Sequence, residues 1–200
     1  MKKQYKILII VGAVVLLLVA WFAGSYNKMV TREETTTQAW ANVQTAYQRR
    51  MDLIPNLMNT VKGAANFEKS TLESVVAARS KASSVTVDAN KLDENSIAKF
   101  QQAQDQLGTS LNRLMVVVER YPELKSNENF LELQAQLEGT ENRISVERMK
   151  FNKTIQDYNT YIRRFPNNIV AGMFGFDKKG YFKAAEGAEN APKVEFDFGN

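Results

Sequence analysis

The chain has 200 residues, enough for one domain of ordinary size. It contains no Cys and no His, which excludes disulfides, thiolate nucleophiles, Ser-His-Asp triads and zinc motifs of the H-E-x-x-H type. Removing Lys2, Lys3 and Lys6 from its 26 basic side chains leaves 23, against 22 acidic ones. This balance argues against a nucleic-acid-binding protein, which needs a basic face to neutralise phosphates.

An uncharged apolar segment near the N-terminus is the first predicted element. It reads ILIIVGAVVLLLVAWFAG from Ile7 to Gly24, and no charge follows until Lys28. At about 1.5 Å per residue, a helix over residues 7–27 spans about 31 Å, close to the ~30 Å hydrocarbon thickness of a bilayer. We therefore expect residues 1–27 to be a cytoplasmic stub and a transmembrane anchor.

The flanks of this segment bear on its retention and orientation. Three lysines precede it, whereas the two basic residues behind it are offset by Glu33 and Glu34, so the positive-inside rule predicts a cytoplasmic N-terminus. The competing interpretation is a cleaved signal peptide. Only the AGS sequence at residues 23–25 resembles a cleavage site, and the apolar run is longer than such peptides usually carry.

Residues 28–166 are predicted to form a helical bundle. The first helix continues from the anchor to about Val61, with Pro55 as an interruption that removes one backbone hydrogen bond. Gly63 follows, and the chain either turns or only bends there. A further helical stretch covers residues 66–81, and SSVTVDAN, residues 83–90, is the expected connection to the next helix.

Two apolar stripes with alternating spacings of 3 and 4 predict the remaining long helices. The first runs from Phe100 to Tyr121 and ends at Pro122. The second covers residues 130–165 and ends at Pro166. Both helices end there because proline disfavours helical geometry in the residue before it. We also expect the aromatic side chain directly before each proline to be buried.

These elements predict an all-α fold: a transmembrane helix followed by an antiparallel, up-and-down bundle of three to four long helices with coiled-coil-type packing. Residues 167–200 are rich in Gly and Asn and are predicted to be an irregular C-terminal segment. Within it, residues 180–188 could form a short helix. The alternation of Val194, Phe196 and Phe198 suggests an extended end.

Three blocks of sequence resemble the LemA family of bacterial membrane proteins. They are RRMDLIPNLMNTVKG, VERYPELKSNENFLELQAQLEGTENRISVERMKFN and YNTYIRRFPNNIVAGMFGF. Their order, their spacing and the N-terminal anchor are similar as well. The resemblance implies an anchored helical bundle outside the cytoplasm and no established catalytic activity. It also implies an association with membrane-linked proteases.

The segment around the helix interruption is the first candidate site. Arg50, Asp52, Pro55 and Asn56 gather charge and freed carbonyls beside a helix break, which could make a docking or ligand-binding notch. The structural alternative is that Arg50 and Asn56 satisfy those carbonyls or pair with carboxylates of neighbouring helices.

A polar face on the last long helix is the second candidate. Its members share spacings of 7 and 4 and could form interhelical ion pairs with Glu119 of the preceding helix and with Arg50 or Arg79 of earlier ones, which would fix helix register. A catalytic carboxylate pair lacks a placed nucleophile or base partner. The face consists of Glu141, Arg148 and Asn152.

Aromatic residues supply the remaining candidates. Tyr121-Pro122 is expected to act as packing punctuation at a helix end. Between the glycines of residues 172–180, Phe174 and Phe176 must either cap the bundle or contact a partner or the membrane surface.

The sequence thus predicts a non-enzymatic envelope scaffold that works through protein–protein contacts and self-associates into a homo-oligomer. A protein partner such as a membrane-linked protease is possible. The expected location is the bacterial inner membrane, with the bundle outside the cytoplasm. The alternative is a binding module for an envelope ligand: a peptidoglycan fragment, an anionic polymer or a lipid. No motif for a cofactor, a metal or nucleic acid is present in the sequence.

Overall fold

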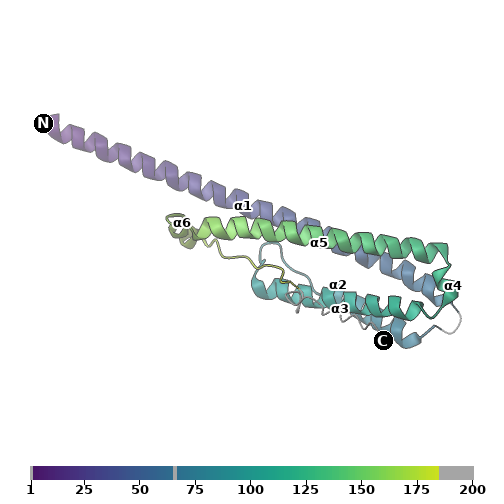
Figure 1. The fold of residues 1–200 in the computed structure, drawn as a ribbon. Helices are drawn as coiled ribbons and strands as arrows, with labels where there is room; N and C mark the ends of the chain where they lie inside the picture. The colour runs from purple at the N-terminus through teal and green to yellow at the C-terminus, as the bar shows by residue number, and fades with distance from the viewer. Residues whose placement is uncertain (1, 65–66, 185–200) are drawn as a thin grey trace, which may run out of the picture.

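The computed structural model describes residues 2–64 and 67–184 (Figure 1). Within these ranges the chain is helical and contains no strand, which confirms the predicted all-α class. The helices in chain order are α1 (Lys2–Lys62), α2 (Lys69–Ser84), α3 (Glu94–Val118), α4 (Pro122–Lys125), α5 (Glu128–Arg163) and α6 (Asn167–Phe174).

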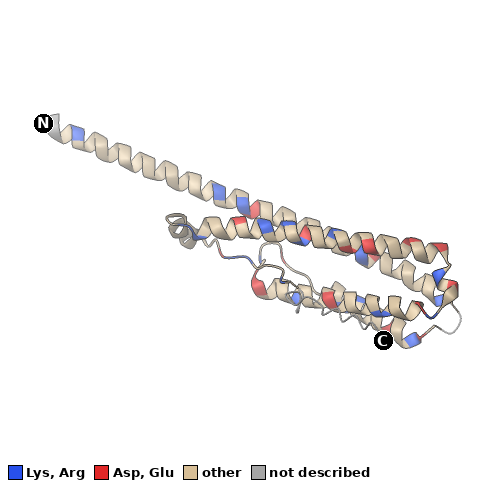
Figure 2. Cartoon of the chain, viewed as in Figure 1, with Lys and Arg blue, Asp and Glu red and all other residues tan. Residues whose placement is uncertain are grey.

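Helix α1 is one continuous helix of 61 residues, about 90 Å long. Its first part projects beyond the bundle, and a stretch of it carries no charge (Figures 1 and 2). From Tyr5 to Val19 its large apolar side chains are at least half exposed. This part is long and apolar enough to cross a membrane.

The other half of α1 forms a four-helix bundle with α2, α3 and α5. Helix α1 packs along α5, and α2 packs along α3. The four helices run alternately up and down (Figure 1). The chain therefore turns after Lys62 rather than bending. Of the predicted three to four bundle helices, four are present in the described residues.

Pro55 lies inside α1 without ending it. Proline cannot donate to the carbonyl four residues earlier, which here belongs to Met51. The Nε of Arg79 in α2 donates to that carbonyl oxygen at 3.2 Å. The helix continues because a side chain from the neighbouring helix satisfies the freed acceptor.

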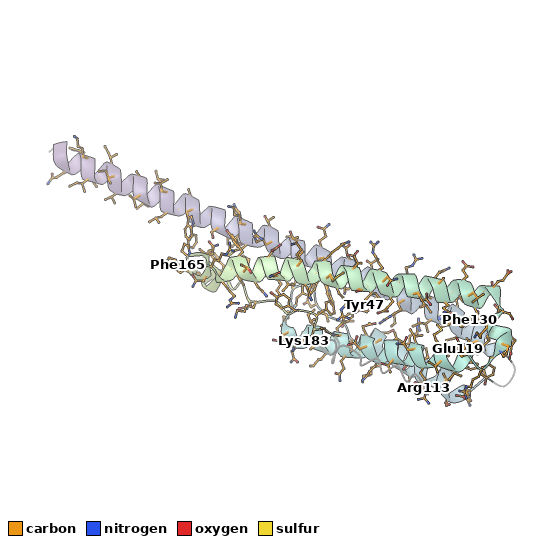
Figure 3. The ribbon with its side chains drawn as sticks, in the orientation of Figure 1. Tyr47, Arg113, Glu119, Phe130, Phe165 and Lys183 are labelled. Carbon is orange, nitrogen blue, oxygen red and sulfur yellow. The ribbon has the colours of Figure 1, made fainter. Side chains whose placement is uncertain are left out.

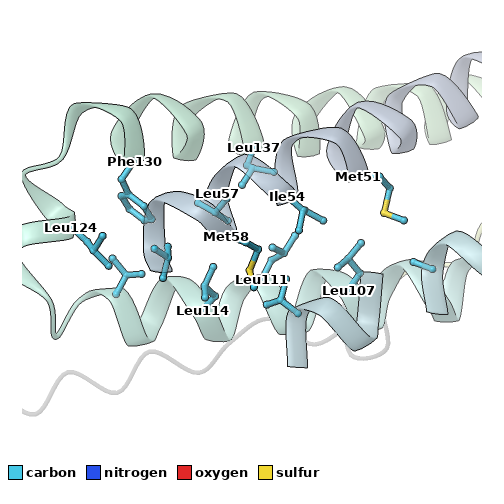
Figure 4. Close-up of a cluster of buried hydrophobic side chains, with 14 residues drawn as sticks. Met51, Ile54, Leu57, Met58, Leu107, Leu111, Leu114, Leu124, Phe130 and Leu137 are labelled. Atoms are coloured by element: carbon cyan, nitrogen blue, oxygen red, sulfur yellow. The ribbon is translucent and has the colours of Figure 1, made fainter. Parts of the chain in front are cut away.

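Among the described residues, the core consists of three clusters of apolar side chains. At the end of the bundle away from the projecting part of α1, all four helices contribute to one cluster, with Leu57 and Leu114 fully buried (Figure 4). We call the opposite end, beside the projecting part, the base. The middle cluster surrounds Trp40 and adds Phe182 from the C-terminal segment. The third lies at the base, where Met29 of α1 packs with Tyr158 and with residues of α6.

Side-chain caps and a left-handed residue define several helix ends. The carboxylate of Asp93 accepts from the backbone N–H groups of Asn95 and Ser96, both at 2.9 Å, and starts α3. The hydrogen bond from the Ser96 hydroxyl to the same carboxylate, together with these backbone bonds, lowers the pKa of Asp93. Helix α6 ends at Gly175, whose φ of 75° is the conformation that favours glycine.

The segment after α5 differs from the sequence-based expectation in two ways. Residues 167–174, predicted to be irregular, form helix α6. Residues 180–184 are not helical, and the rest of the helix expected over 180–188, like the expected extended end, lies outside the described residues.

The aromatic side chain before Pro166 is also not buried as predicted. Phe165 is 81% exposed, because α5 ends at Arg163 and Arg164 takes an extended conformation. The side chain therefore leaves the apolar stripe of the helix. The other apolar positions of this stripe from Phe130 to Tyr158 are buried, except Leu133, which is partly buried.

Candidate functional site

The guanidinium of Arg50 joins three helices inside the bundle. Arg50 is only 4% exposed. Its Nη1 donates to Oε2 of Glu141 in α5 at 2.9 Å. Its Nη2 donates to Gln104 in α3, at 2.7 Å to the side-chain Oε1 and at 3.1 Å to the backbone oxygen. Arg50 thus fixes the relative register of α1, α3 and α5.

Tyr47 lies one helical turn before Arg50 and shares its environment. The Arg50 guanidinium carbon lies 5.1 Å from the centre of the Tyr47 ring. Burial raises the pKa of Tyr47, while the nearby positive charges of Arg148 and Arg50 oppose that shift. The hydroxyl therefore stays protonated at neutral pH and is not a base.

The other members of the predicted notch do not join this network. Asp52 is exposed and accepts a hydrogen bond from Gln48 of its own helix at 2.7 Å. Pro55 and Asn56 are exposed as well. The carbonyl freed by the proline is satisfied by Arg79, and neither Arg50 nor Asn56 is its donor.

The residues at the turn between α3 and α5 make local contacts. Glu119 pairs with Lys125 at 2.6 Å, whereas the sequence had suggested a partner on the polar face of the last long helix. Tyr121 is half-buried and packs against the Phe67 ring at 4.9 Å between centroids. Pro122 begins the short helix α4.

The second constellation is built on a segment that runs back from α6 along the bundle, residues 176–184, which we call the strap. Three amide side chains hold it, each donating to and accepting from one strap residue. Asn159 does so with Lys179 (2.9 and 3.0 Å). Asn152 pairs with Phe182 (2.8 and 2.9 Å). Gln101 pairs with Lys183 (2.9 and 3.0 Å).

These amides act as a backbone partner would in a sheet. Each pair satisfies both the N–H and the C=O of a strap residue that has left regular structure. Two of the amides lie on α5 and one on α3. The strap is therefore held to both helices without any strand pairing.

Phe182 anchors the strap in the middle cluster. Its side chain is 4% exposed and its ring lies 5.5 Å from Phe151 and 6.1 Å from Trp40, centre to centre. On the outer side the Arg148 guanidinium lies 4.8 Å from the ring centre. Arg148 also donates to the Lys183 carbonyl at 2.9 Å.

Lys179 ties the strap to α1. Its buried ammonium group lies 2.9 Å from a carboxylate oxygen of Glu33 and 5.3 Å from the centre of the Tyr158 ring. Burial raises the pKa of Tyr158, and the negative charges of Glu33 and Asp177 add to that shift. The ion pair joins the strap to α1 one or two turns beyond the uncharged apolar part of that helix, residues 7–27, which we call the bare part.

Gly180 lets the strap approach the start of α3. Its N–H donates to the Leu92 carbonyl at 2.7 Å. A Cβ at this position would lie 2.6 Å from Cα of Glu94. Only glycine permits this approach, because any side chain would meet backbone that cannot yield.

The structure thus brings together only some of the predicted site residues. Arg50 and Glu141 meet directly, whereas Arg148 and Asn152 meet through the strap. Phe174 and Phe176 lie at the base against Tyr26, at 4.9 and 5.6 Å between ring centres. Sequence reasoning missed Gln101 and Asn159, two of the amides that hold the strap, the strap residues Lys179 and Gly180, and the α1 residue Glu33.

The residues at these sites fix the helices and the strap relative to one another. The two Nη atoms of Arg50, the three amides that hold the strap and the Lys179 ammonium make hydrogen bonds or ion pairs within the bundle. The buried Nε of Arg50 has no partner among the described residues. Charged groups held in this way specify one arrangement of the helices more than they add to stability. Both constellations hold the bundle in a single register.

The fold and these sites define a class: a helical bundle with one apolar N-terminal helix, which fits a single-pass membrane protein. Residues 39–196 match the profile of the LemA family. This match covers more than half of the chain and confirms the resemblance noted in the sequence. The chain belongs to the LemA family.

Individual relatives are more distant. The chain is 28% identical over 179 residues to magnetosome protein MamQ 2 of Paramagnetospirillum magneticum, a match that covers 79% of this chain and 64% of that protein. It is 26% identical over 165 residues to protein LemA of Metamycoplasma hominis, covering 82% and 72%. The chain therefore spans slightly less than two thirds of the length of MamQ 2.

Replacing Arg50 with Ala should lower the free energy of unfolding by about 1–3 kcal/mol, because buried Gln104 loses its charged partner. The matched control is Glu141→Gln. This side chain is 61% exposed and still offers an acceptor, so we expect a loss below about 1 kcal/mol. Denaturant unfolding of the full chain in detergent micelles, followed by circular dichroism, measures both. Equal losses would contradict the assigned role of Arg50.

Replacing Gly180 with Ala should release the strap from α3 while the bundle stays folded, because the new methyl group would overlap the Glu94 backbone. Hydrogen–deuterium exchange at the amides of residues 180–183 should accelerate, with little change in the interior of α3 and α5. The control is Gly172→Ala, whose Cβ would meet no described atom within 4 Å. Strap exchange that is the same in both variants would show that the close approach at Gly180 does not hold the strap.

Proposed function

We propose that this protein is a membrane-anchored scaffold that acts through protein–protein contacts and self-associates. The N-terminus lies in the cytoplasm and the bundle lies outside it, at the inner membrane of a bacterium. The observation that carries the proposal is the continuity of α1, which runs without a break from the bare apolar part into the core of the bundle.

The exposure of the apolar part supports its placement in a bilayer. Leu8, Leu16 and Leu17 are each at least two thirds exposed. Isolated apolar side chains are common on protein surfaces, but contiguous patches of this size mark an interaction site or a membrane. The lysines before the segment favour a cytoplasmic N-terminus.

The surface of the bundle supports a role in contacts. One groove lies between α1 and α5, and its lining includes small or polar side chains such as Ala41, Thr45 and Gly139. The charged residues Arg49, Asp52 and Arg143 also line it. A second groove between α2 and α3 has a similar lining, including Ala77, Ala98 and Thr109. Basic and acidic residues are interspersed over the bundle (Figure 2), and a surface of this kind suits a protein partner better than a polyanion.

The relatives support work at a membrane. Three of the similar proteins are named as magnetosome proteins, and one carries the family name LemA. We carry over only the association with a membrane, since the match covers 64% of the MamQ proteins. A membrane-linked protease remains a candidate partner from the family resemblance.

A second candidate function is the binding of an envelope ligand. A small cavity of about 290 Å³ lies beside the strap. Arg163, Lys178 and Lys183 line it and are exposed. Glu94 also lines it and pairs with Lys183 at 3.0 Å. The excess of positive charge suits an anionic polymer better than a neutral one. Binding of such a polymer would raise the melting temperature of the folded chain.

The full chain, purified in mild detergent, should run as an oligomer or with an envelope protein when its mass is measured by light scattering and crosslinking. Thr45→Arg and Thr109→Arg each place a large cation in one groove, and the face that mediates contact is the one whose variant dissociates. A monomer without a co-purifying partner would contradict the scaffold. If that monomer also melts at a higher temperature with an anionic polymer, the ligand-binding function takes its place.

A further inference from the structure

Helix α6 buries one face and exposes an apolar one. Val170 and Ala171 are buried against the base of the bundle. On the opposite face, Ile169 is 53% and Met173 66% exposed, and they lie four residues apart on one side of the helix. No residue from Asn167 to Phe174 carries a charge. A helix that faces water normally shows a polar outer face.

Phe165 extends this apolar face beyond the helix. Its side chain, 81% exposed, lies at the end of the bundle beside which the bare part of α1 emerges (Figure 3). Nothing in the packing of the bundle requires a large aromatic side chain there. Together Phe165, Ile169 and Met173 form an exposed apolar surface on the α6 end, which we call the foot.

The position of the foot along α1 is fixed by direct contacts. The Phe174 ring lies 5.8 Å from the Phe22 ring and 4.9 Å from the Tyr26 ring. The Ser25 hydroxyl donates to Asn167 at 2.7 Å. Phe22, Ser25 and Tyr26 are among the last uncharged residues before Lys28. If α1 crosses the membrane, α6 therefore sits where the span meets the lipid headgroups.

Distances along the helix agree with this depth. Phe22 and Tyr26 are separated by about 6 Å along the helix axis. The headgroup region adds about 5–7 Å on each side of the hydrocarbon core. The contacts of α6 thus extend over the thickness of one interfacial layer, so its exposed side chains face the boundary between headgroups and acyl chains.

A groove between α1 and α6 is apolar as well. It has a volume of about 560 Å³ and is lined almost entirely by apolar side chains. On the α1 side these residues belong to the predicted span. An open apolar groove at this depth meets acyl chains. Its lining is Leu18, Val19, Phe22, Ala23, Tyr26, Asn27 and Phe174.

We propose that the foot is a second membrane contact, in which Phe165, Ile169 and Met173 insert into the boundary layer of the bilayer beside the span. The proposal rests on the proposed placement of α1 across the membrane. Arg163, Arg164 and Lys178 flank α6 and are exposed, so they are placed to contact lipid phosphates. Anchored at two points, the bundle keeps a fixed face toward the membrane.

The absence of Cys from the chain allows a direct test with single spin labels in vesicles of phosphatidylethanolamine and phosphatidylglycerol. Ile169→Cys and Met173→Cys place the label on the foot. Leu16→Cys places it in the span, and Val116→Cys places it on α3 at a side chain that is 70% exposed. The measured quantity is the ratio of collision with oxygen, which partitions into lipid, to collision with a water-soluble nickel chelate.

We expect the ratio at residues 169 and 173 to exceed that at residue 116 severalfold and to stay below the value at residue 16, which lies deeper in the bilayer. If residue 16 shows the lipid value while both foot labels resemble residue 116, the foot proposal is wrong and the anchor stands. If residue 16 itself resembles residue 116, the anchor and the foot both fail. Strong spin–spin coupling between foot labels at high lipid dilution would assign the surface to a second copy of the chain and overturn the lipid contact.

Discussion

The structure depends on the absence of a break in α1. One helix supplies both the apolar segment and the longest wall of the bundle, so the two parts cannot turn independently of each other. Proline within a helix usually bends or ends it. Here Pro55 is accommodated because Arg79 reaches across from α2 to the freed carbonyl of Met51. The continuity of the rod is thus a tertiary property as well as a local one.

The other features keep that rod in register with its neighbours. Arg50 joins α1 to α3 and α5 through charged hydrogen bonds in the interior, and the strap crosses the same helices nearer the base. Apolar stripes alone allow helices to slide by a turn, since knobs fit neighbouring holes almost as well. Buried polar partners remove that freedom, because a shift of one turn would leave them unpaired. The strap also adds Phe182 to a cluster that would otherwise be open around Trp40.

Much of the bundle could be predicted from the sequence, because apolar periodicity reports which face of a helix is buried. It identified α3, the outer half of α1 and most of α5. The periodicity wrongly predicted that Phe165 is buried, since the apolar spacing continues in the sequence after the backbone has left the helix. It also could not choose between a turn and a bend at Gly63, a choice made by the packing of α2 on α3.

The sites were less predictable, for a physical reason. Arg50 and Glu141 are far apart in sequence, and their pairing follows only from the register of α1 and α5. Glu119 finds Lys125 because the local turn brings the two side chains together. The strap has no periodic signal at all. The one indication of it in the sequence is Asn152 and Asn159, two amides seven residues apart on one helix face. That these amides bind a backbone segment can be recognised only when the strap itself is known.

The most direct test of the central claim is the distance between two spin labels, one on each side of the junction between the apolar part of α1 and the bundle. Leu16→Cys with Thr45→Cys on the Cys-free chain gives such a pair, and both side chains are exposed. A continuous helix predicts a narrow distribution near 44 Å, from about 1.5 Å for each residue between them, in vesicles as in detergent. A broad distribution, or one centred well below that distance, would mean that α1 bends or breaks at the junction and that the bundle is not rigidly joined to its anchor.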